Sequence, residues 1–305
     1  MANDSSTIPL VSALCVVYNQ AQYLRQCLDG LVAQETTFPY EIIIHDDAST
    51  DGSQDIIREY ADRYPDRIRT ILQEKNQFSQ KKEIWATFLI PEARGKYITF
   101  CEGDDWWCDP QKLQRQADFM EANPDVSICY HQFREYDQLK QDFEPHDNPA
   151  PKDGLTVKEL FWGGYMHTTT FMIRVNAEAE QLRRDIGWVK CMDIVTAYLY
   201  MDRGRIAGIP GYMSVFRRNT GIWTTSTWYR NLIENLIMNA SIRSVVKDPR
   251  LRDEIDKWND EFRFVLFRTM HEWEGNRNSL AYRLGKTLLK PFNWAKCLLS
   301  PKGSK

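Results

Sequence analysis

Three carboxylates stand within four residues at Glu102-Gly103-Asp104-Asp105, directly after the strand candidate Lys96–Cys101. At the end of a buried strand these groups cannot all turn toward bulk water, and they repel one another unless a positive charge lies among them. A hard divalent cation that prefers oxygen ligands removes both difficulties. The cluster therefore predicts a Mg²⁺ or Mn²⁺ site that also takes phosphate oxygens. A solvated acidic turn is the alternative, which the preceding apolar strand and the following Trp106-Trp107 disfavour.

A second acidic turn, Asp46-Asp47, follows the isoleucine-rich stretch Glu41–His45. A carboxylate in such a turn can accept hydrogen bonds from the N–H of a nucleobase or from ribose hydroxyls. The competing interpretation is helix capping, with Ser49, Thr50 or Asp51 as the N-cap of a helix that starts near Ser53. The two roles are compatible, because Asp51 can cap the helix while Asp47 binds a ligand.

Strands and helices must bring both turns to one edge of a sheet. Apolar runs that indicate strands are Leu10–Val17, Glu41–His45, Ile68–Leu72, Lys96–Cys101 and Val126–Tyr130. Apolar residues at helical spacing lie between them, at Tyr23–Val32, Gln54–Arg63, Lys82–Arg94 and in a helix that Pro110 opens and that runs to Met120. This alternation predicts an α/β fold with a parallel sheet and helices on both of its faces. Ligands of such sheets bind outside the carboxyl ends of the strands, and both acidic turns lie there.

The second half of the chain is less regular. Residues 137–153 are polar with three prolines, which predicts a loop or a subdomain boundary. Strand candidates at Thr170–Arg174 and Ile206–Ile209 flank a helix candidate at Ile194–Met201, and a short apolar element lies at Leu160–Trp162. From Trp228 onward the spacing is helical.

The composition is that of a globular protein, with 43% hydrophobic and 27% charged residues. The net charge of −3 gives no reason to expect nucleic acid as a partner. The chain lacks the glycine-rich dinucleotide fingerprint and the phosphate loop, which argues against dinucleotide oxidoreductases and kinases, and it has no serine elbow. The five histidines show no metal-ligand spacing, so a hydrogen-bonded structural role is the default for each.

The seven cysteines are odd in number and form no C-x-x-C pair, so we expect reduced, mostly buried thiols in a cytoplasmic protein. We find no signal-peptide pattern and no apolar stretch of the roughly 18–20 residues that a membrane span needs. Residues 277–305 carry seven basic and no acidic side chains. The apolar residues of this tail share one helical face, so it could lie on an anionic membrane or pack on the globular domain, although Pro291 would kink the helix. These apolar residues are Leu288, Phe292, Ala295 and Leu299.

With these residues in hand, the chain resembles the family 2 glycosyltransferases, inverting enzymes of the GT-A fold. Val11–Asn19 (VSALCVVYN) is similar to the family's first strand and Tyr-Asn loop. Glu41–Gly52 (EIIIHDDASTDG) resembles the segment that holds the nucleoside, and Glu102–Pro110 (EGDDWWCDP) resembles the metal-binding D-x-D region. The good match covers about residues 10–135. Within it, Glu102 stands where many members have Asp, and His45 stands where valine is more common.

A looser likeness to bacterial capsule, O-antigen and cell-wall members continues through Gly163–Arg174, Cys191–Asp193 and Met213–Trp223 (MSVFRRNTGIW). The resemblance implies that Asp47 contacts the base, which we expect to be uracil, while Asp46 supports the site. Asp104 and Asp105 would hold the ribose and a Mn²⁺ or Mg²⁺ ion, with Glu102 nearby, and the cation would stabilise the leaving diphosphate. The residues expected to bind the nucleotide are Val16, Tyr18, Asn19, Asp46, Asp47 and Asp104.

Inversion requires a general base that takes the proton of the attacking acceptor hydroxyl. The position at which the family keeps this base falls on Asp193. Asp185 and Asp202 are the alternatives, and a simple helix cap is the non-catalytic interpretation of Asp193. Residues near the acceptor or the diphosphate would be His167, Thr168, Arg217, Arg218 and Trp223.

We therefore expect residues 1–135 to bind the nucleotide sugar and 136–227 to bind the acceptor, as two halves of one GT-A domain. Residues 228–305 would form a helical extension with a basic amphipathic tail, and 283–305 could touch the cytoplasmic face of the inner membrane. The expected reaction moves a sugar from a nucleoside diphosphate sugar, such as a UDP sugar, to a hydroxyl of a glycan or lipid-linked glycan in bacterial surface polysaccharide synthesis.

Two other functions compete with this one. A sugar nucleotidyltransferase would be expected to have a glycine-rich basic loop after the first strand, where this chain has Tyr18–Gln22 (YNQAQ). A non-catalytic carbohydrate-binding protein would suit the ten tryptophans, but it gives no reason for acidic clusters at two strand ends.

Overall fold

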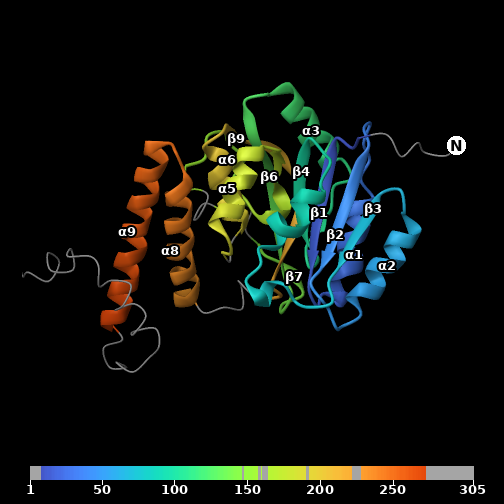
Figure 1. The fold of residues 1–305 in the computed structure, drawn as a ribbon, viewed down its shortest axis with the longest axis horizontal. Coiled ribbons are helices and arrows are strands. Elements are labelled where there is room, and N and C mark those ends of the chain that lie inside the picture. Colours follow the sequence, from blue (N-terminus) through green and yellow to red (C-terminus); the bar gives the residue numbers. More distant parts are fainter. Residues whose placement is uncertain are drawn as a thin grey trace, which may run out of the picture.

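The computed structural model describes residues 8–145, 148–156, 159, 164–189, 192–221 and 228–272. These residues form one mixed sheet of nine strands with helices on both faces (Figure 1). The strands are β1 (Val11–Val17), β2 (Tyr40–Asp46), β3 (Ile68–Leu72), β4 (Tyr97–Glu102), β5 (Trp106–Trp107), β6 (Val126–Asp137), β7 (Asp142–Phe143), β8 (Met172–Arg174) and β9 (Arg205–Arg218). The helices are α1 (Ala21–Val32), α2 (Ser53–Arg63), α3 (Lys112–Ala122), α5 (Ala177–Ile186), α6 (Met192–Met201), α8 (Trp228–Val245) and α9 (Pro249–Glu272).

The strand order is β3-β2-β1-β4-β8-β6-β9-β5, with β7 paired to β6. The first four strands of this order are parallel to one another. Strand β8 is antiparallel to both β4 and β6, while β6 and β9 run parallel. Strand β6 spans residue 135, so the sheet continues from the first part of the chain into the second.

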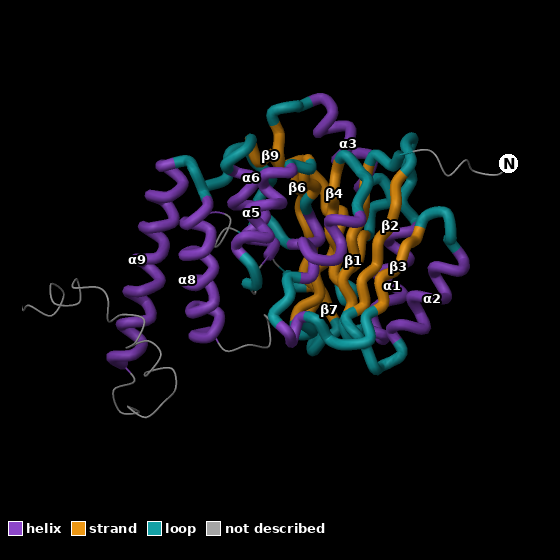
Figure 2. Tube along the Cα trace, viewed as in Figure 1, coloured by secondary structure: helices purple, strands orange, loops and turns teal. Residues whose placement is uncertain are grey.

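Alternate residues of the strands feed two hydrophobic clusters, one on each face of the sheet. On β1, Ala13, Cys15 and Val17 pack with buried residues of α1, α2 and α3, whereas Leu14 belongs to the opposite cluster. The opposite cluster includes residues of α5, α6 and α8, and Figure 2 shows helices on both sides of the strands. Both faces of the strands are thus covered by apolar side chains, and polar groups are found at the strand ends.

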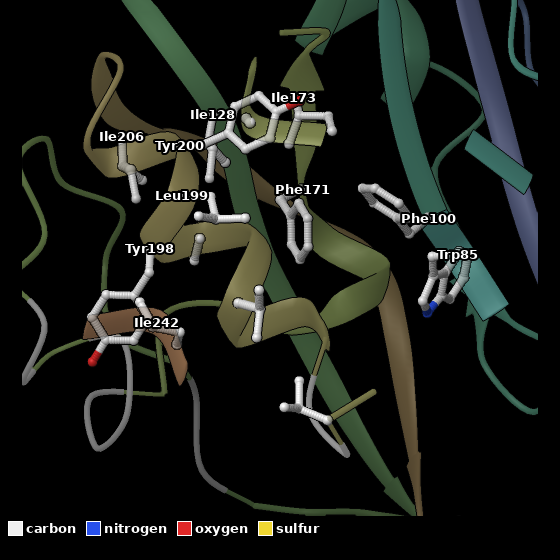
Figure 3. Packing of buried hydrophobic residues seen from close by; sticks show 14 of the residues in the cluster. Trp85, Phe100, Ile128, Phe171, Ile173, Tyr198, Leu199, Tyr200, Ile206 and Ile242 are labelled. Carbon is white, nitrogen blue, oxygen red and sulfur yellow. The ribbon is translucent and has the colours of Figure 1, made fainter. Parts of the chain in front are cut away.

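The hydrophobic cluster that contains Leu14 joins β4 to α6. Phe171 lies between Phe100 of β4 and Leu199 of α6 (Figure 3), with the two phenylalanine ring centroids 5.2 Å apart. Trp85 packs edge-on against Phe100 on the other side, at 5.1 Å. This packing fixes α6 against the sheet close to the carboxyl end of β4.

The sequence predicted the strands and helices of the first half within a few residues. Strands β6 and β9 extend well past the predicted Val126–Tyr130 and Ile206–Ile209, because the two pair with each other along most of their length. The α/β architecture is confirmed, but the sheet is mixed, since β8, β5 and β7 are antiparallel additions. Strand β5 and helix α5 were not predicted.

The helix predicted at Lys82–Arg94 is wrong in its extent and type. The chain forms a π-helical turn at Trp85–Leu89 and a 3₁₀ turn at Ile90–Glu92. Pro91 has no N–H to continue a regular ladder. The Glu83 carboxylate accepts the N–H groups of Trp85 and Ala86 and so caps the start of the π-helical turn. The apolar element at Leu160–Trp162 lies outside the described residues.

Helices α8 and α9 lie side by side beyond α5 and α6, at the end of the molecule opposite β3 (Figure 1). Among the described residues, no helix has the length and apolar character to cross a membrane. The basic tail at 277–305 lies outside the described residues.

Candidate active site

The acidic turn, residues 102–105, joins the end of β4 to β5. It packs directly on the end of β1, where the N–H of Gly103 donates to the carbonyl of Val16 at 2.9 Å. A Cβ at position 103 would lie 2.6 Å from Gln20 Oε1 and 3.1 Å from Val17 Cγ2, so a glycine is needed for this close approach. The sequence predicted this cluster at a strand end, and the structure confirms that position.

Asp104 and Asp105 are both buried at this turn. The hydroxyl of Thr220 donates to Asp104 Oδ2 at 2.7 Å, and the backbone N–H of Arg217 donates to Asp105 Oδ1 at 2.8 Å. Burial raises the pKa of Asp104, against the lowering effect of the Thr220 hydrogen bond and the Arg217 charge. Burial also raises the pKa of Asp105 well above its usual range, and the charges of Asp104 and Glu102 add to this.

Asp105 Oδ2 is buried and has no hydrogen-bond partner among the described residues. An ionised carboxylate in that position is costly unless a cation neutralises it. A divalent cation bound to its free oxygen would supply that charge, so the donor set fits a metal ion. In the described part of the chain no three His, Cys, Asp or Glu side chains surround a common point, so a cation here would also need ligands from a substrate or from water.

Asp193, in the first turn of α6, lies near enough to the acidic turn for its charge to act on Glu102. Burial, together with the charges of Asp104 and Asp193, raises the pKa of Glu102 to about 8. Burial also raises the pKa of Asp193, while a hydrogen bond from the side chain of Thr168 opposes the shift. The structure therefore brings Asp193 and Glu102, which are far apart in the sequence, close enough to interact.

The two alternatives to Asp193 are placed differently. Asp185 is exposed on α5 and accepts a hydrogen bond from Gln181 at 2.8 Å. Asp202 accepts the backbone N–H groups of Lys247 and Asp248, at 3.2 and 2.9 Å, and so ties the end of α6 to the start of α9. Both carboxylates therefore already accept hydrogen bonds from other parts of the protein.

The second acidic turn, Asp46-Asp47, lies at the end of β2, beside the acidic turn of β4 across the intervening β1. Asp46 Oδ1 accepts the N–H of Ser49 at 2.9 Å and Nε2 of Gln54 at 2.7 Å. Asp47 accepts the backbone N–H groups of Gln77 and Phe78 at 2.7 and 3.0 Å. Asp46 thus shapes its own turn, and Asp47 holds the 76–78 loop over the strand end.

The loop after β1 is locked to this second turn. Asn19 has a left-handed backbone, with φ of 52°, which asparagine tolerates better than most residues. Its N–H donates to the Ser49 hydroxyl and its side chain accepts the N–H of Thr50, both at 2.8 Å. Tyr18 is 46% exposed beside it, and Val16 is partly buried on β1.

The N-cap of α2 is Gly52 and not Asp51 as predicted, but the Asp51 side chain does hydrogen-bond the start of this helix. The Asp51 carboxylate accepts the N–H of Ser53, the first residue of α2, at 3.0 Å, and the N–H of Ala21, the first residue of α1, at 2.9 Å. Asp51 therefore holds the starts of both helices near the ends of β1 and β2.

Arg217 lies against the acidic turn, and each of its three guanidinium nitrogens donates a hydrogen bond to the protein. It donates to the carbonyl of Asp104 at 2.8 Å and to the side chains of Gln138 and Gln26 at 2.8 and 2.7 Å. The group also lies within 5.4 Å of three aromatic ring centroids, those of Tyr23, Trp106 and Tyr136. Its position is that of a clamp on the turn.

Arg218 points elsewhere, toward Glu135 and Glu144 at 3.4 and 3.6 Å. Trp223, the third residue expected near the diphosphate, lies outside the described residues. The structure therefore directs the side chains of Arg217 and Arg218 to different partners.

His167 and Thr168 begin a 3₁₀ turn at Thr168–Thr170 that reaches the acidic turn. His167 Nδ1 lies 3.6 Å from Asp105 Oδ2, and Thr168 bonds Asp193. Burial lowers the pKa of His167 to about 3, so its imidazole is neutral at neutral pH. The sequence did place these two residues near the site, but it gave no sign of the pairing with Asp105.

A buried lysine, which the sequence analysis missed, supports this 3₁₀ turn. Lys112 Nζ donates to Thr99 Oγ1 at 3.0 Å and to Gln116 Oε1 at 2.8 Å. Gln116 in turn donates to the carbonyl of Thr170 at 3.0 Å. The only signal available was the i, i+4 spacing of Lys112 and Gln116 on a helix, which is far more common on exposed surfaces.

Comparison with known proteins bears on the identity of this arrangement. The chain is 36% identical over 217 residues to the uncharacterized protein Rv1520 of Mycobacterium tuberculosis, a match that covers 70% of this chain and 60% of that protein. It is 32% identical over 167 residues to TuaG of Bacillus subtilis, which its name provisionally assigns as a glycosyltransferase of teichuronic acid biosynthesis, covering 54% of this chain and 62% of TuaG. The chain thus spans less than two thirds of the length of these curated relatives.

Two solved structures share the fold at low sequence identity. S. aureus TarS in complex with UDP-GlcNAc superposes with a TM-score of 0.63 at 17% identity, covering 88% of this chain and 76% of that chain. The mannosyltransferase PcManGT of Pyrobaculum calidifontis, in complex with GDP-Man and Mn²⁺, gives a TM-score of 0.58 at 15% identity, covering 98% and 85%. The described residues therefore form a GT-A-like fold. The model of glycosyl transferase family 2 matches residues 12–181, more than half of the chain, and the chain belongs to that family.

Proposed function

We propose that this protein is an inverting glycosyltransferase that moves a sugar from a nucleoside diphosphate sugar to a hydroxyl of a glycan or lipid-linked glycan. The likeness to TuaG, named for teichuronic acid, supports a role in bacterial surface polysaccharide synthesis. UDP-GlcNAc in TarS and GDP-Man in PcManGT support a nucleoside diphosphate sugar as the donor, and we propose a UDP sugar.

The observation that carries this proposal is the convergence of Asp193 with the acidic turn at the carboxyl end of β4. The charge of Asp193 raises the pKa of Glu102, so the two carboxylates lie near each other, and Asp104 and Asp105 are beside them. A site with a base on one side and a diphosphate-binding cluster on the other suits transfer with inversion. Asp193 takes the proton of the acceptor hydroxyl while the oxygen of that hydroxyl forms a bond to the anomeric carbon. The bond from that carbon to the diphosphate oxygen breaks with its electron pair on the oxygen.

A Mn²⁺ or Mg²⁺ ion would be held by Asp105 and Asp104, with Glu102 nearby, and when bound it supplies positive charge to the leaving diphosphate. The Mn²⁺ in PcManGT and the unpartnered Asp105 Oδ2 support such an ion. Asp47 and Asp46, with Val16, Tyr18 and Asn19, form the nucleoside side of the pocket. We also propose that Arg217 positions Asp104, because each nitrogen of its guanidinium already donates one hydrogen bond to the protein.

We further propose that residues 1–135 bind the donor and 136–227 the acceptor, with His167 and Thr168 on the acceptor side. The basic tail at 283–305 would bind the cytoplasmic face of the membrane, where a lipid-linked acceptor lies. Co-sedimentation with anionic liposomes checks the tail: we expect the full chain to sediment and a chain truncated before residue 283 to remain in solution. Equal binding by both forms would remove this part of the proposal.

The main experiment measures nucleotide release from a panel of UDP, dTDP and GDP sugars with candidate glycan acceptors. NMR of the product then gives the anomeric configuration. We expect Asp193→Asn to lose transfer while binding nucleotide normally, because only the proton acceptor is lost, and Asp105→Ala to lose both transfer and metal-dependent nucleotide binding. Product with retained configuration would overturn the inverting mechanism. Full transfer by Asp193→Asn would remove the base assignment, and an active Asp105→Ala enzyme would contradict the metal assignment.

A further inference from the structure

His167 is held rigidly with its ring edge toward the acidic turn. The Thr170 hydroxyl donates to the His167 carbonyl at 2.7 Å and accepts the His167 N–H at 3.1 Å, which fixes the backbone. The imidazole packs against two aromatic rings, with its centroid 3.9 Å from that of Phe216 and 5.7 Å from that of Phe133. The ring is therefore oriented by packing, and Nδ1 faces Asp105 Oδ2 at 3.6 Å.

These two facing atoms share an unusual property. Both are buried, and neither has a hydrogen-bond partner among the residues that the structure describes. A separation of 3.6 Å is too long for an N–H···O hydrogen bond. Buried polar atoms without partners are rare in folded proteins, so a pair of them aimed at each other calls for a third group between them.

The separation suits two ligands of one metal ion. Two atoms that each lie about 2.1 Å from a common ion are roughly 3.0 Å apart at a right angle and about 3.4 Å apart at the tetrahedral angle. Only a small approach of the two side chains is needed from 3.6 Å. Only 1% of the Asp105 surface is exposed, so bulk water has little access to its free oxygen.

We propose that His167 Nδ1 and Asp105 Oδ2 are ligands of the same divalent cation, and that the nitrogen ligand makes this site select Mn²⁺ over Mg²⁺. The inference rests on the metal site of the proposed function and adds a residue to it. Mg²⁺ takes oxygen ligands almost exclusively. Mn²⁺, a first-row transition metal, also accepts an imidazole nitrogen as a ligand. A site built from carboxylates alone would show a weaker preference, because the nitrogen ligand adds to it.

The test uses the full chain with Mn²⁺ and either UDP or GDP, whichever binds. Pulsed electron paramagnetic resonance detects nitrogen coordinated to Mn²⁺, and labelling the histidines with ¹⁵N identifies the source. We expect a ¹⁴N coupling in the wild-type protein that changes to a ¹⁵N coupling on labelling and disappears in His167→Gln. In the same variant, we expect the Kd for Mn²⁺ to weaken by about 10-fold or more while the Kd for Mg²⁺ changes little, because the amide offers an oxygen ligand.

His131→Gln is the matched control, because His131 is also buried but its Nδ1 lies 2.7 Å from the carbonyl of Gln132. It should keep the ¹⁴N coupling and the Mn²⁺ affinity, and thermal unfolding of both variants checks that they are folded. Mn²⁺ bound by the wild type without any histidine coupling would overturn this inference and leave the metal site of the proposed function intact. A wild-type protein that binds neither Mn²⁺ nor Mg²⁺ would overturn both.

Discussion

Lys112→Met tests the buried support beneath the 3₁₀ turn that carries His167 and Thr168. Lys112 is fully buried in α3, and its ammonium lies 4.1 Å from the ring centroid of Trp107. Its two acceptors are neutral, Thr99 Oγ1 and Gln116 Oε1, so no carboxylate among them compensates its charge. Burial accordingly lowers the pKa of Lys112 from 10.5 to about 7.

The sign and size of the effect follow from this shift. Between pH 7 and pH 10.5 the unfolded chain keeps a proton that the folded protein has lost, so the free energy of unfolding rises with pH in this window. Below pH 7 the folded protein bears the whole cost of burying the charge, about 5 kcal/mol for a shift of this size, and by pH 10.5 that cost is gone. From pH 7 to pH 9 the stability gained from this one group is about 2 kcal/mol.

The assay is urea unfolding of the wild type and Lys112→Met at pH 7, 8 and 9. Methionine fills a similar volume and loses two hydrogen bonds, a cost of about 1–3 kcal/mol that does not depend on pH. We expect the difference between the two proteins to change by about 2 kcal/mol over this range, with the variant relatively more stable at pH 7. Lys257→Met, at an exposed position of α9, controls for loss of a surface charge. Parallel pH curves for wild type and Lys112→Met would refute the reasoning.

Two further predictions concern the packing and the protonation of the site. Gly30→Ala places a Cβ 2.5 Å from the carbonyl oxygen of Trp107, a backbone atom that cannot move alone, so we expect a loss of about 1–3 kcal/mol or more in thermal unfolding. An unchanged melting temperature would contradict the close packing of α1 on β5. Thr168→Val removes the hydrogen bond that lowers the pKa of Asp193, so that pKa rises and the acid limb of the kcat–pH profile moves to higher pH. An acid limb that stays in place would show that Asp193 is not the titrating base.

The parts of the site that could be predicted from the sequence are those written in local patterns. A continuous apolar run followed by acidic residues marks a buried strand and its carboxyl end, and this holds for Asp46-Asp47 after β2 and Glu102–Asp105 after β4. The parallel order of β1, β2 and β4 then follows from the helices between the strands. Both turns were placed correctly because each acidic pair or cluster directly follows, in the sequence, the strand that positions it.

Pairings between distant segments left no comparable signal. Strand β8 inserts between β4 and β6 as only three residues, Met172–Arg174, and it carries the 3₁₀ turn with His167 and Thr168 to the acidic turn. Strand β5 is only Trp106-Trp107, too short for periodicity to indicate it. The buried Lys112 looks like any surface lysine, since its burial depends on the sheet that α3 covers.

The pairing of β5 with β9 explains why Arg217 lies against the acidic turn. In that antiparallel pair Trp106 lies opposite Val215, so Arg217, two residues further along β9, is beside the acidic turn that precedes Trp106. Its backbone N–H then bonds Asp105 while its guanidinium bonds the carbonyl of Asp104, and the chain reaches Thr220 in time to bond the Asp104 carboxylate. The end of β9 and the end of β4 thus form one unit, in which the backbone of one segment holds the carboxylates of the other. We therefore expect a substitution that disturbs the end of β9 to displace the carboxylates of Asp104 and Asp105 as well.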